Sequence, residues 1–271
     1  MLLSNWMLRV VWVAAACVSL ASTAPVSAGA SSSDNYDDNV RDSDLWDVHI
    51  EASGLVTETN QRLQYTSGGM SENQENVGRY TLKQPLPYSQ AWVAILEVHV
   101  GTYEGVSLDE AIYGMCITVV NSSDVDDILW LGLTRERGQQ MWSTNNETDG
   151  INGQEHNANT ASESGRVKLS WDGSSSFTGD YDEGSGWQEF APINVGAWGM
   201  GIGSTFTLSV GGADEYCGFV LNDGTKTYAD NFVLVPEPAT LSLFALGGLA
   251  ILRQWRKASR PHPRQDQRNA P

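Results

Sequence analysis

Short segments in which apolar and polar residues alternate follow one another along the middle of the chain. In residues 165–171, Val167, Leu169 and Trp171 fall on one face, with the period of two expected of a strand that buries one side. Turn-forming pairs such as Asp172-Gly173 separate these segments. The segments with this pattern are 46–50, 62–66, 91–100, 112–120, 128–134, 165–171, 198–202, 205–210, 217–221 and 227–235.

This density of short strands, with no sustained helical period, predicts an all-β protein. We expect one antiparallel β-sandwich or jelly roll over residues 45–234. Residues 31–44 are acidic and almost free of apolar side chains, so we interpret them as a flexible linker. Residues 144–164 are rich in Asn and contain His156, and we expect a long polar loop there.

The N-terminus has the features of a secretory signal peptide over residues 1–30. Arg9 precedes an apolar run at 10–20, and small residues around Ala28 fit a cleavage site. An uncleaved membrane helix is the alternative, although the run is short of the roughly 20 residues that a span needs. The sequence therefore predicts export.

The C-terminus contains a second signal in three parts. Pro236, Glu237 and Pro238 precede an apolar run at 239–252, which we interpret as a short transmembrane helix that contacts the membrane. A basic cluster follows and would remain cytoplasmic, which leaves the bulk of the chain outside. The basic residues are Arg253, Arg256, Lys257 and Arg260.

Motif, apolar run and arginine-rich tail together resemble the bacterial PEP-CTERM sorting signal over residues 235–260, within a C-terminal sorting segment that we place at residues 235–271. The resemblance implies an exosortase that recognises Pro236, Glu237 and Pro238, removes the tail and passes the protein to the cell envelope or extracellular matrix. Such systems accompany exopolysaccharide production. The tail departs from the family pattern by continuing to Pro271, and an anchor that is never cleaved is the alternative.

Two segments also resemble laminin-G-like and concanavalin A-like sandwiches. Residues 166–184 (RVKLSWDGSSSFTGDYDEG) match the strand, turn and strand of a hairpin in these folds, and residues 226–238 (KTYADNFVLVPEP) match a last strand joined to the sorting signal. The resemblance covers residues 45–235 and implies a concanavalin A-like fold.

Composition narrows the classes of partner. The 271 residues carry a formal net charge of −17, while 41% are hydrophobic, enough for a packed core. Nucleic acid is excluded, because phosphate binding needs clustered Lys and Arg. A field of this sign keeps an exported protein in solution and attracts divalent cations.

Cys116 and Cys217 both lie on predicted strands in an oxidising compartment, since the signal peptide removes Cys17. They form a disulfide if their strands face each other. Otherwise they are two buried thiols, and the sequence does not decide between these two arrangements.

No catalytic motif stands out, so we predict that the domain is not an enzyme. The paired carboxylates of sandwich-fold glucanases have no clear counterpart. We interpret Asp180, Asp182 and Glu183 as an exposed acidic turn rather than a catalytic pair.

Calcium is the most plausible ion, since it prefers carboxylate and amide oxygens. Its candidate ligands are Asp124, Asp126, Asp127, Asp180 and Asp182, although their spacing is not diagnostic and no resident cofactor is required. Trp92, Trp130 and Trp171 are expected in the core, whereas Trp142 and Trp187 lie near polar loops and are candidates to stack on a glycan.

The predicted function is therefore that of an exported bacterial surface or matrix protein. An exosortase would sort it, and its sandwich would bind exopolysaccharide. A secreted glycan-active enzyme on the same fold, and a calcium-dependent adhesion module, are the alternatives.

Overall fold

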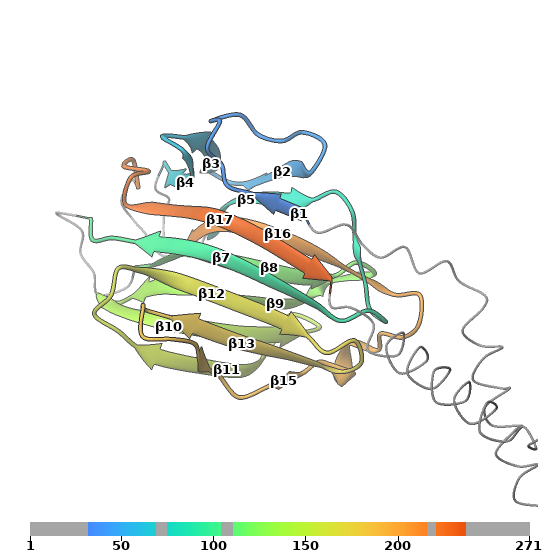
Figure 1. Cartoon of the computed structure of the whole chain (residues 1–271). Coiled ribbons are helices and arrows are strands. Elements are labelled where there is room, and N and C mark those ends of the chain that lie inside the picture. The colour runs from blue at the N-terminus through green and yellow to red at the C-terminus, as the bar shows by residue number, and fades with distance from the viewer. Residues whose placement is uncertain (1–31, 69–74, 104–110, 216–220, 237–271) are drawn as a thin grey trace, which may run out of the picture. The chain divides into compact units, whose positions relative to one another are not determined.

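The computed structural model describes residues 32–68, 75–103, 111–215 and 221–236. These residues form two antiparallel sheets and one short 3₁₀ turn, Gly196–Trp198. The predicted all-β sandwich is thus confirmed (Figure 1). The described residues do not include the predicted signal peptide, Cys217, or the part of the chain from Glu237 onward.

The first sheet, sheet A, has nine strands in the order β14-β13-β12-β7-β17-β4-β3, with β1 beside β17 and β15 beside β13. Its strands are β1 (Ser32–Asp34), β3 (Gly54–Thr59), β4 (Arg62–Ser67), β7 (Trp92–Val100), β12 (Ser164–Trp171), β13 (Ser176–Asp182), β14 (Gln188–Glu189), β15 (Ile193–Asn194) and β17 (Thr227–Pro236).

The second sheet, sheet B, has eight strands in the order β11-β10-β9-β8-β16-β5-β2, with β6 beside β16. Its strands are β2 (Trp46–Glu51), β5 (Glu75–Leu82), β6 (Leu86–Pro87), β8 (Ile112–Asn121), β9 (Asp124–Glu136), β10 (Gln139–Thr148), β11 (Ile151–Asn159) and β16 (Thr205–Glu215). None of the helical turns in the described part of the chain is long and apolar enough to span a bilayer.

Apolar side chains at alternate positions of the strands form the core between the two sheets. β7 buries every second residue, from Trp92 to Val100, and leaves the others partly exposed. At one end of the core, Trp171 packs edge-on to Phe206 at 5.0 Å and lies 4.6 Å from Phe177 between ring centroids. These contacts join β12 and β13 of sheet A to β16 of sheet B.

Two sequence predictions about local structure were wrong. Residues 144–164 were expected to be a loop, but β10 and β11 form a hairpin whose turn, Asp149-Gly150, has positive φ at both residues. β11 is an edge strand with mostly exposed residues, so it lacks the apolar alternation that would have marked it. Residues 198–202 form the end of the 3₁₀ turn and a loop, not a strand.

The acidic segment 31–44 is also not a flexible linker where the structure describes it. Ser32, Ser33 and Asp34 pair with β17, the Tyr36 side chain is fully buried, and Asp34 accepts a hydrogen bond of 2.7 Å from the Trp46 indole. The pairing with β17 and the buried ring of Tyr36 hold this segment against the sandwich, although its composition predicts a solvent-exposed linker. The sandwich therefore begins at β1 and ends with Pro236, opposite Trp92, rather than at residues 45 and 234.

Glu58 lies on the core-facing side of β3 near this segment. Both of its carboxylate oxygens are buried and have no hydrogen-bond partner among the described residues. Burial, followed by the like charges of Asp34, Asp38 and Asp42, raises the pKa of Glu58 from 4.5 to about 7. The folded state therefore favours the protonated carboxyl group.

This raised pKa predicts a stability that depends on pH. The folded state gains from Glu58 below its ordinary pKa of 4.5, and that contribution is lost as pH rises through about 7. In Glu58→Gln, the free energy of unfolding should fall less over this window than in the parent protein. Denaturant titrations at several pH values measure the slope. The control is Glu189→Gln, at an exposed carboxylate on β14, which should keep the parent slope; parallel curves for all three proteins would contradict the prediction.

Candidate functional site

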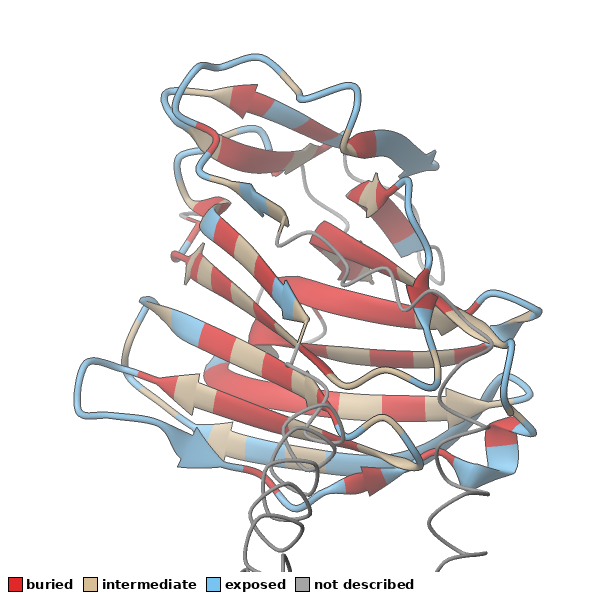
Figure 2. Cartoon of the chain, turned by 45° about the vertical axis from the view of Figure 1, so that its right-hand side comes forward, coloured by how far each residue is buried: buried red, intermediate tan, exposed pale blue. Residues whose placement is uncertain are grey.

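The outer face of sheet B is hollowed. Thr118, Ser143 and Ser209 point away from the core on neighbouring strands, yet their exposed fractions are only 1%, 1% and 6%. On the outer face of sheet A, by contrast, Glu97 and Lys168 are partly exposed. Figure 2 shows this contrast, with strands of alternating colour in one sheet and a nearly continuous buried strand in the other. Sheet B therefore carries a groove that solvent reaches only in part.

The floor of this groove is made of small side chains. One row across the strands runs through Ala213, Gly114 and Thr134 in register, beside Cys116. A Cβ atom at Gly114 would lie 2.6 Å from the Leu133 carbonyl oxygen. Neighbouring strands thus approach too closely for any larger residue, and the floor stays low.

We call this pocket, of about 140 Å³, the sheet B groove. Trp130 stands on one side of it because Leu129, Leu131 and Leu133 occupy the core-facing positions of β9. Its lining residues are Glu75, Arg79, Ile112, Tyr113, Gly114, Cys116, Trp130, Thr134, Ala213, Asp214 and Glu215.

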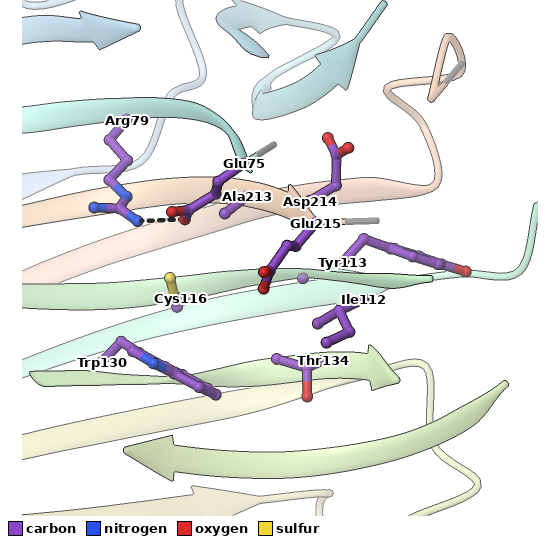
Figure 3. Close-up of a pocket in the computed structure, with 11 residues that line it drawn as sticks. Glu75, Arg79, Ile112, Tyr113, Cys116, Trp130, Thr134, Ala213, Asp214 and Glu215 are labelled. Atoms are coloured by element: carbon purple, nitrogen blue, oxygen red, sulfur yellow. Dashed lines mark ion pairs between the residues drawn. The ribbon is translucent and has the colours of Figure 1, made fainter. Parts of the chain in front are cut away.

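Two carboxylates lie opposite each other at one end of the groove. Glu75 on β5 and Glu215 on β16 are paired in register, so both side chains project from the same face (Figure 3). Arg79 lies four residues further along β5 and on the same face. Its Nη2 atom is 3.7 Å from Oε1 of Glu75. Burial raises the pKa of Glu75; Arg79 opposes the shift, and the charges of Glu51, Glu215 and Glu147 add to it.

The other polar groups of the groove have internal roles. Asp214 accepts hydrogen bonds from Tyr65 at 2.5 Å and from Asn76 at 2.9 Å. Burial raises the pKa of Cys116, whose thiol lies 3.4 Å from the Thr118 hydroxyl and is free in the structure. Cys217 lies outside the described residues, so the predicted bridge between these cysteines stays a prediction.

The division of the tryptophans between core and surface differs from the one that the sequence predicted. Trp92 and Trp171 are buried in the core as expected. Trp142 is fully buried, stacks on Tyr181 at 5.5 Å and donates to Glu183 at 2.5 Å, so its prediction as a glycan-stacking residue was wrong. It faces the core because it lies opposite core-facing Leu133 of β9 in the register of sheet B. The pattern of residues 139–148 alone does not show which face is buried.

Trp187 and Trp130 are the tryptophans with accessible rings at the two outer faces. Trp187 is 37% exposed and lies about 5 Å from the charged groups of Arg166 and Lys168; a role in glycan binding stays a prediction. Trp130 was expected in the core but faces the groove. The alternation of three leucines in residues 128–134 marks its outward position, and this signal was available in the sequence.

Three carboxylates near the β9–β10 edge could hold a cation. The oxygens of Asp124, Asp127 and Asp149 lie within 4.8 Å of one another. Buried Asp127 is already satisfied by the Asn121 amide at 3.0 Å and the Asp149 backbone N–H at 3.1 Å. The structure thus brings together two of the predicted calcium ligands with a third residue, Asp149, while Asp126 is not in the group. Occupancy by calcium stays a prediction.

Asp180 and Asp182 have other partners. Asp180 pairs with Lys168 at 3.2 Å, and Asp182 pairs with Arg166 and accepts the backbone N–H groups of Gly184 and Gly186. The Arg166 hydrogen bond holds the pKa of Asp182 below its ordinary value. Among the described residues, neither aspartate belongs to the group of three carboxylates that could hold a cation, and cations on β12 neutralise both. Their role as calcium ligands stays a prediction.

Comparison with known proteins identifies the C-terminal signal. Residues 234–257 match the model described as "PEP-CTERM protein-sorting motif". The chain therefore carries a signal for export and sorting to the cell envelope, as its sequence predicted. No curated protein matches the chain.

Solved structures share the sandwich at low identity. A putative β-glucanase from Mycobacterium abscessus superposes with a TM-score of 0.50 and 10% identity, over 75% of this chain and 98% of that one. An endo-1,3-β-glucanase from Streptomyces sioyaensis gives 0.48 and 11%, over 78% and 96%. A protein of unknown function from Saccharomyces cerevisiae gives 0.47 and 12%, over 72% and 98%.

These likenesses concern the fold alone, and they correct one prediction. The absence of a catalytic motif led us to predict that the chain is not an enzyme. That exclusion was wrong, because the described domain shares its fold with a putative β-glucanase, so this architecture does not exclude an enzyme. A search for one sequence motif tests only carboxylates at one fixed spacing along the chain, whereas a sheet also brings together carboxylates that are distant in the sequence.

Proposed function

We propose that this chain is an exported protein, sorted to the cell envelope, whose β-sandwich binds a polysaccharide chain in the sheet B groove. The observation that carries the proposal is Trp130, an indole that stands beside a floor of small residues in the hollowed face. A flat aromatic ring offers the apolar C–H face of a sugar a stacking surface, and a few polar groups around it fix orientation.

The polar groups that border Trp130 suit sugar hydroxyls. Glu75 and Glu215 are acceptors, whereas the Thr134 hydroxyl is already hydrogen-bonded to Ser143 and to the Met141 carbonyl oxygen. Arg79 supplies donors, and its Nε has no hydrogen-bond partner among the described residues. An unpaired buried donor costs free energy, and a ligand hydroxyl would recover part of that cost.

Replacement of Trp130 tests the glycan-binding proposal. Trp130→Ala in the purified full-length protein should weaken binding to a polysaccharide found on a glycan array by about tenfold, which is about 1.4 kcal/mol. Trp187→Ala, on the other face of the sandwich, is the matched control and should bind as the parent does. Loss of binding in Trp187→Ala but not in Trp130→Ala would place the site on sheet A and refute the proposal for sheet B.

The sorting signal supports the cellular half of the proposal. An exosortase would act at the Pro236-Glu237-Pro238 motif, and the apolar run would hold the protein in the membrane until then. The described part of the domain ends at Pro236, so the motif follows the last strand directly. The sandwich would therefore be presented at the envelope surface, where exopolysaccharide is a partner within reach.

Removal of residues 237–271 tests the sorting. The shortened protein keeps all of β17 and should fold, but it should be released to the medium while the full chain stays with the envelope fraction. Fractionation and immunoblotting measure both. A variant with Ala239→Gly keeps the motif and serves as the control. Envelope retention of the shortened protein would mean that the sandwich itself, and not the tail, localises the chain.

A second candidate function is hydrolysis of the bound glycan, favoured by Glu75 and Glu215. Glu75 and Glu215 project from directly opposite positions on β5 and β16, so their side chains can adopt the arrangement of retaining glycosidases, in which two carboxyl groups lie about 5–5.5 Å apart. The raised pKa of Glu75 suits a general acid that protonates the leaving oxygen. Glu215 would attack the anomeric carbon, and water would then release the sugar with Glu75 as base.

Single substitutions distinguish hydrolysis from binding. Glu75→Gln and Glu215→Gln should each reduce the release of reducing ends by about a thousandfold or more, since removal of either group blocks one step. Glu97→Gln, on the outer face of sheet A, should keep the parent rate. No release of reducing ends by the parent protein from a polysaccharide that it binds would remove the enzyme and leave the binding proposal intact.

A further inference from the structure

The sheet B groove has an excess of negative charge. Two carboxylates, Glu75 and Glu215, face it against one cation, Arg79, whereas the Asp214 carboxylate points to the other side of β16 and is held by Tyr65 and Asn76 (Figure 3). Arg79 pairs with Glu75, and no ion pair of the described residues involves Glu215. The groove thus keeps at least one acidic group without a cationic partner from the part of the chain that the structure describes.

The register makes this excess costly in the unliganded protein. Glu75 and Glu215 are directly opposite, and like charges in that position destabilise a sheet. Glu215 is half-buried, while the Glu75 side chain is 51% exposed. A cation placed between the two carboxylates would relieve the repulsion.

Three carboxylates on the outer face of sheet A have partners from the same sheet. There Asp180 pairs with Lys168, Asp182 pairs with Arg166, and Glu97 accepts a hydrogen bond of 2.9 Å from Asn231. Within the described part of the chain, Glu215 forms no such pair, and it lies in a groove that also has an aromatic wall.

We infer that the sheet B groove selects glycans that carry protonated amines, such as chains of N-deacetylated amino sugars, over neutral and uronate polymers. This inference rests on the proposed glycan binding at Trp130. The ring face of the sugar would stack on the indole while its ammonium group pairs with Glu215 and Glu75. A uronate in the same position would place a third charge of the same sign against the two carboxylates.

The chemistry of an amino sugar fits this arrangement in two ways. An ammonium group donates three hydrogen bonds, enough to contact both carboxylates at once. Its N-acetylated form has no charge and a larger substituent, so it would lose the ion pair and crowd the Glu215 side of the groove. The groove therefore discriminates by charge, while Trp130 supplies affinity that is common to many glycans.

Matched oligosaccharides test the inference on the purified full-length protein. The probes are β-1,4-linked glucosamine, its fully N-acetylated counterpart of equal length, and a uronate oligosaccharide, at about pH 6, where amines are protonated. We expect the glucosamine probe to bind about tenfold or more tightly than the acetylated one, and the uronate to bind most weakly. The preference should shrink when salt rises from about 50 mM to about 500 mM, because screening weakens the ion pairs.

The double variant Glu75→Gln/Glu215→Gln should lose the preference while keeping the parent affinity for the acetylated probe. It should also melt no lower than the parent, since it removes a repulsion. Glu97→Gln/Asp230→Asn removes two charges from the outer face of sheet A and is the control for net charge; it should keep the preference.

The outcomes separate the inference from the proposed function. If Trp130→Ala weakens binding of all probes but the parent does not prefer the glucosamine chain, the groove binds glycans and the inference is wrong. If the preference survives in the double variant, it arises from the net charge of the domain and the inference is again wrong. If no oligosaccharide binds, both the proposed function and the inference fail.

Discussion

The structure depends on the aromatic contacts that join its two sheets. Trp171 and Phe177 of sheet A meet Phe206 of sheet B at centroid distances of 5.0 and 5.2 Å, and Trp92 packs against Phe206 at 6.2 Å. Large rings of this kind dominate the apolar area that a core buries. Since each of these residues occupies one face of a strand, their burial also decides which face of every neighbouring residue points outward. The groove is therefore a consequence of the core: once Leu129, Leu131 and Leu133 face inward, Trp130 faces out.

The same alternation explains how much of the fold could be predicted. β7 and β12 were recognised because each buries one face and exposes the other, which produces a clear period of two. β11 was missed because it is an edge strand whose residues are polar on both faces. β5 was missed as well, although it supplies Glu75 and Arg79. One glycine, Gly78, and a polar start interrupt its pattern, and its pairing with β16 and β2 is long-range information. The average composition of residues 31–44 is acidic and polar, and it conceals the single aromatic side chain, Tyr36, that is buried in the core.

The candidate site was less predictable than the fold, for a physical reason. The sheet B groove is lined by residues of β5, β8, β9 and β16, and β5 and β16 are more than a hundred positions apart in the chain. Only strand order and register bring Glu75 opposite Glu215, and neither can be obtained from local patterning. Trp130 is the exception, because its outward position follows from its immediate neighbours. The sorting signal, in contrast, is contiguous, and the sequence alone was sufficient to recognise it.

The distribution of cations over the sandwich connects these points. The chain has 16 Lys and Arg residues against 33 Asp and Glu, so cations are the scarce partner. Arg166 and Lys168 stand at alternate positions of β12, where each neutralises an aspartate of β13 on the outer face of sheet A. The corresponding face of sheet B receives Arg79 beside its groove, opposite carboxylates from two strands. An exported protein gains solubility from net negative charge wherever that charge is solvated. At Glu75 and Glu215 the charge is paired like with like across β5 and β16, which costs stability in the free protein. Their position beside an indole and a glycine floor is better explained by a ligand that uses them.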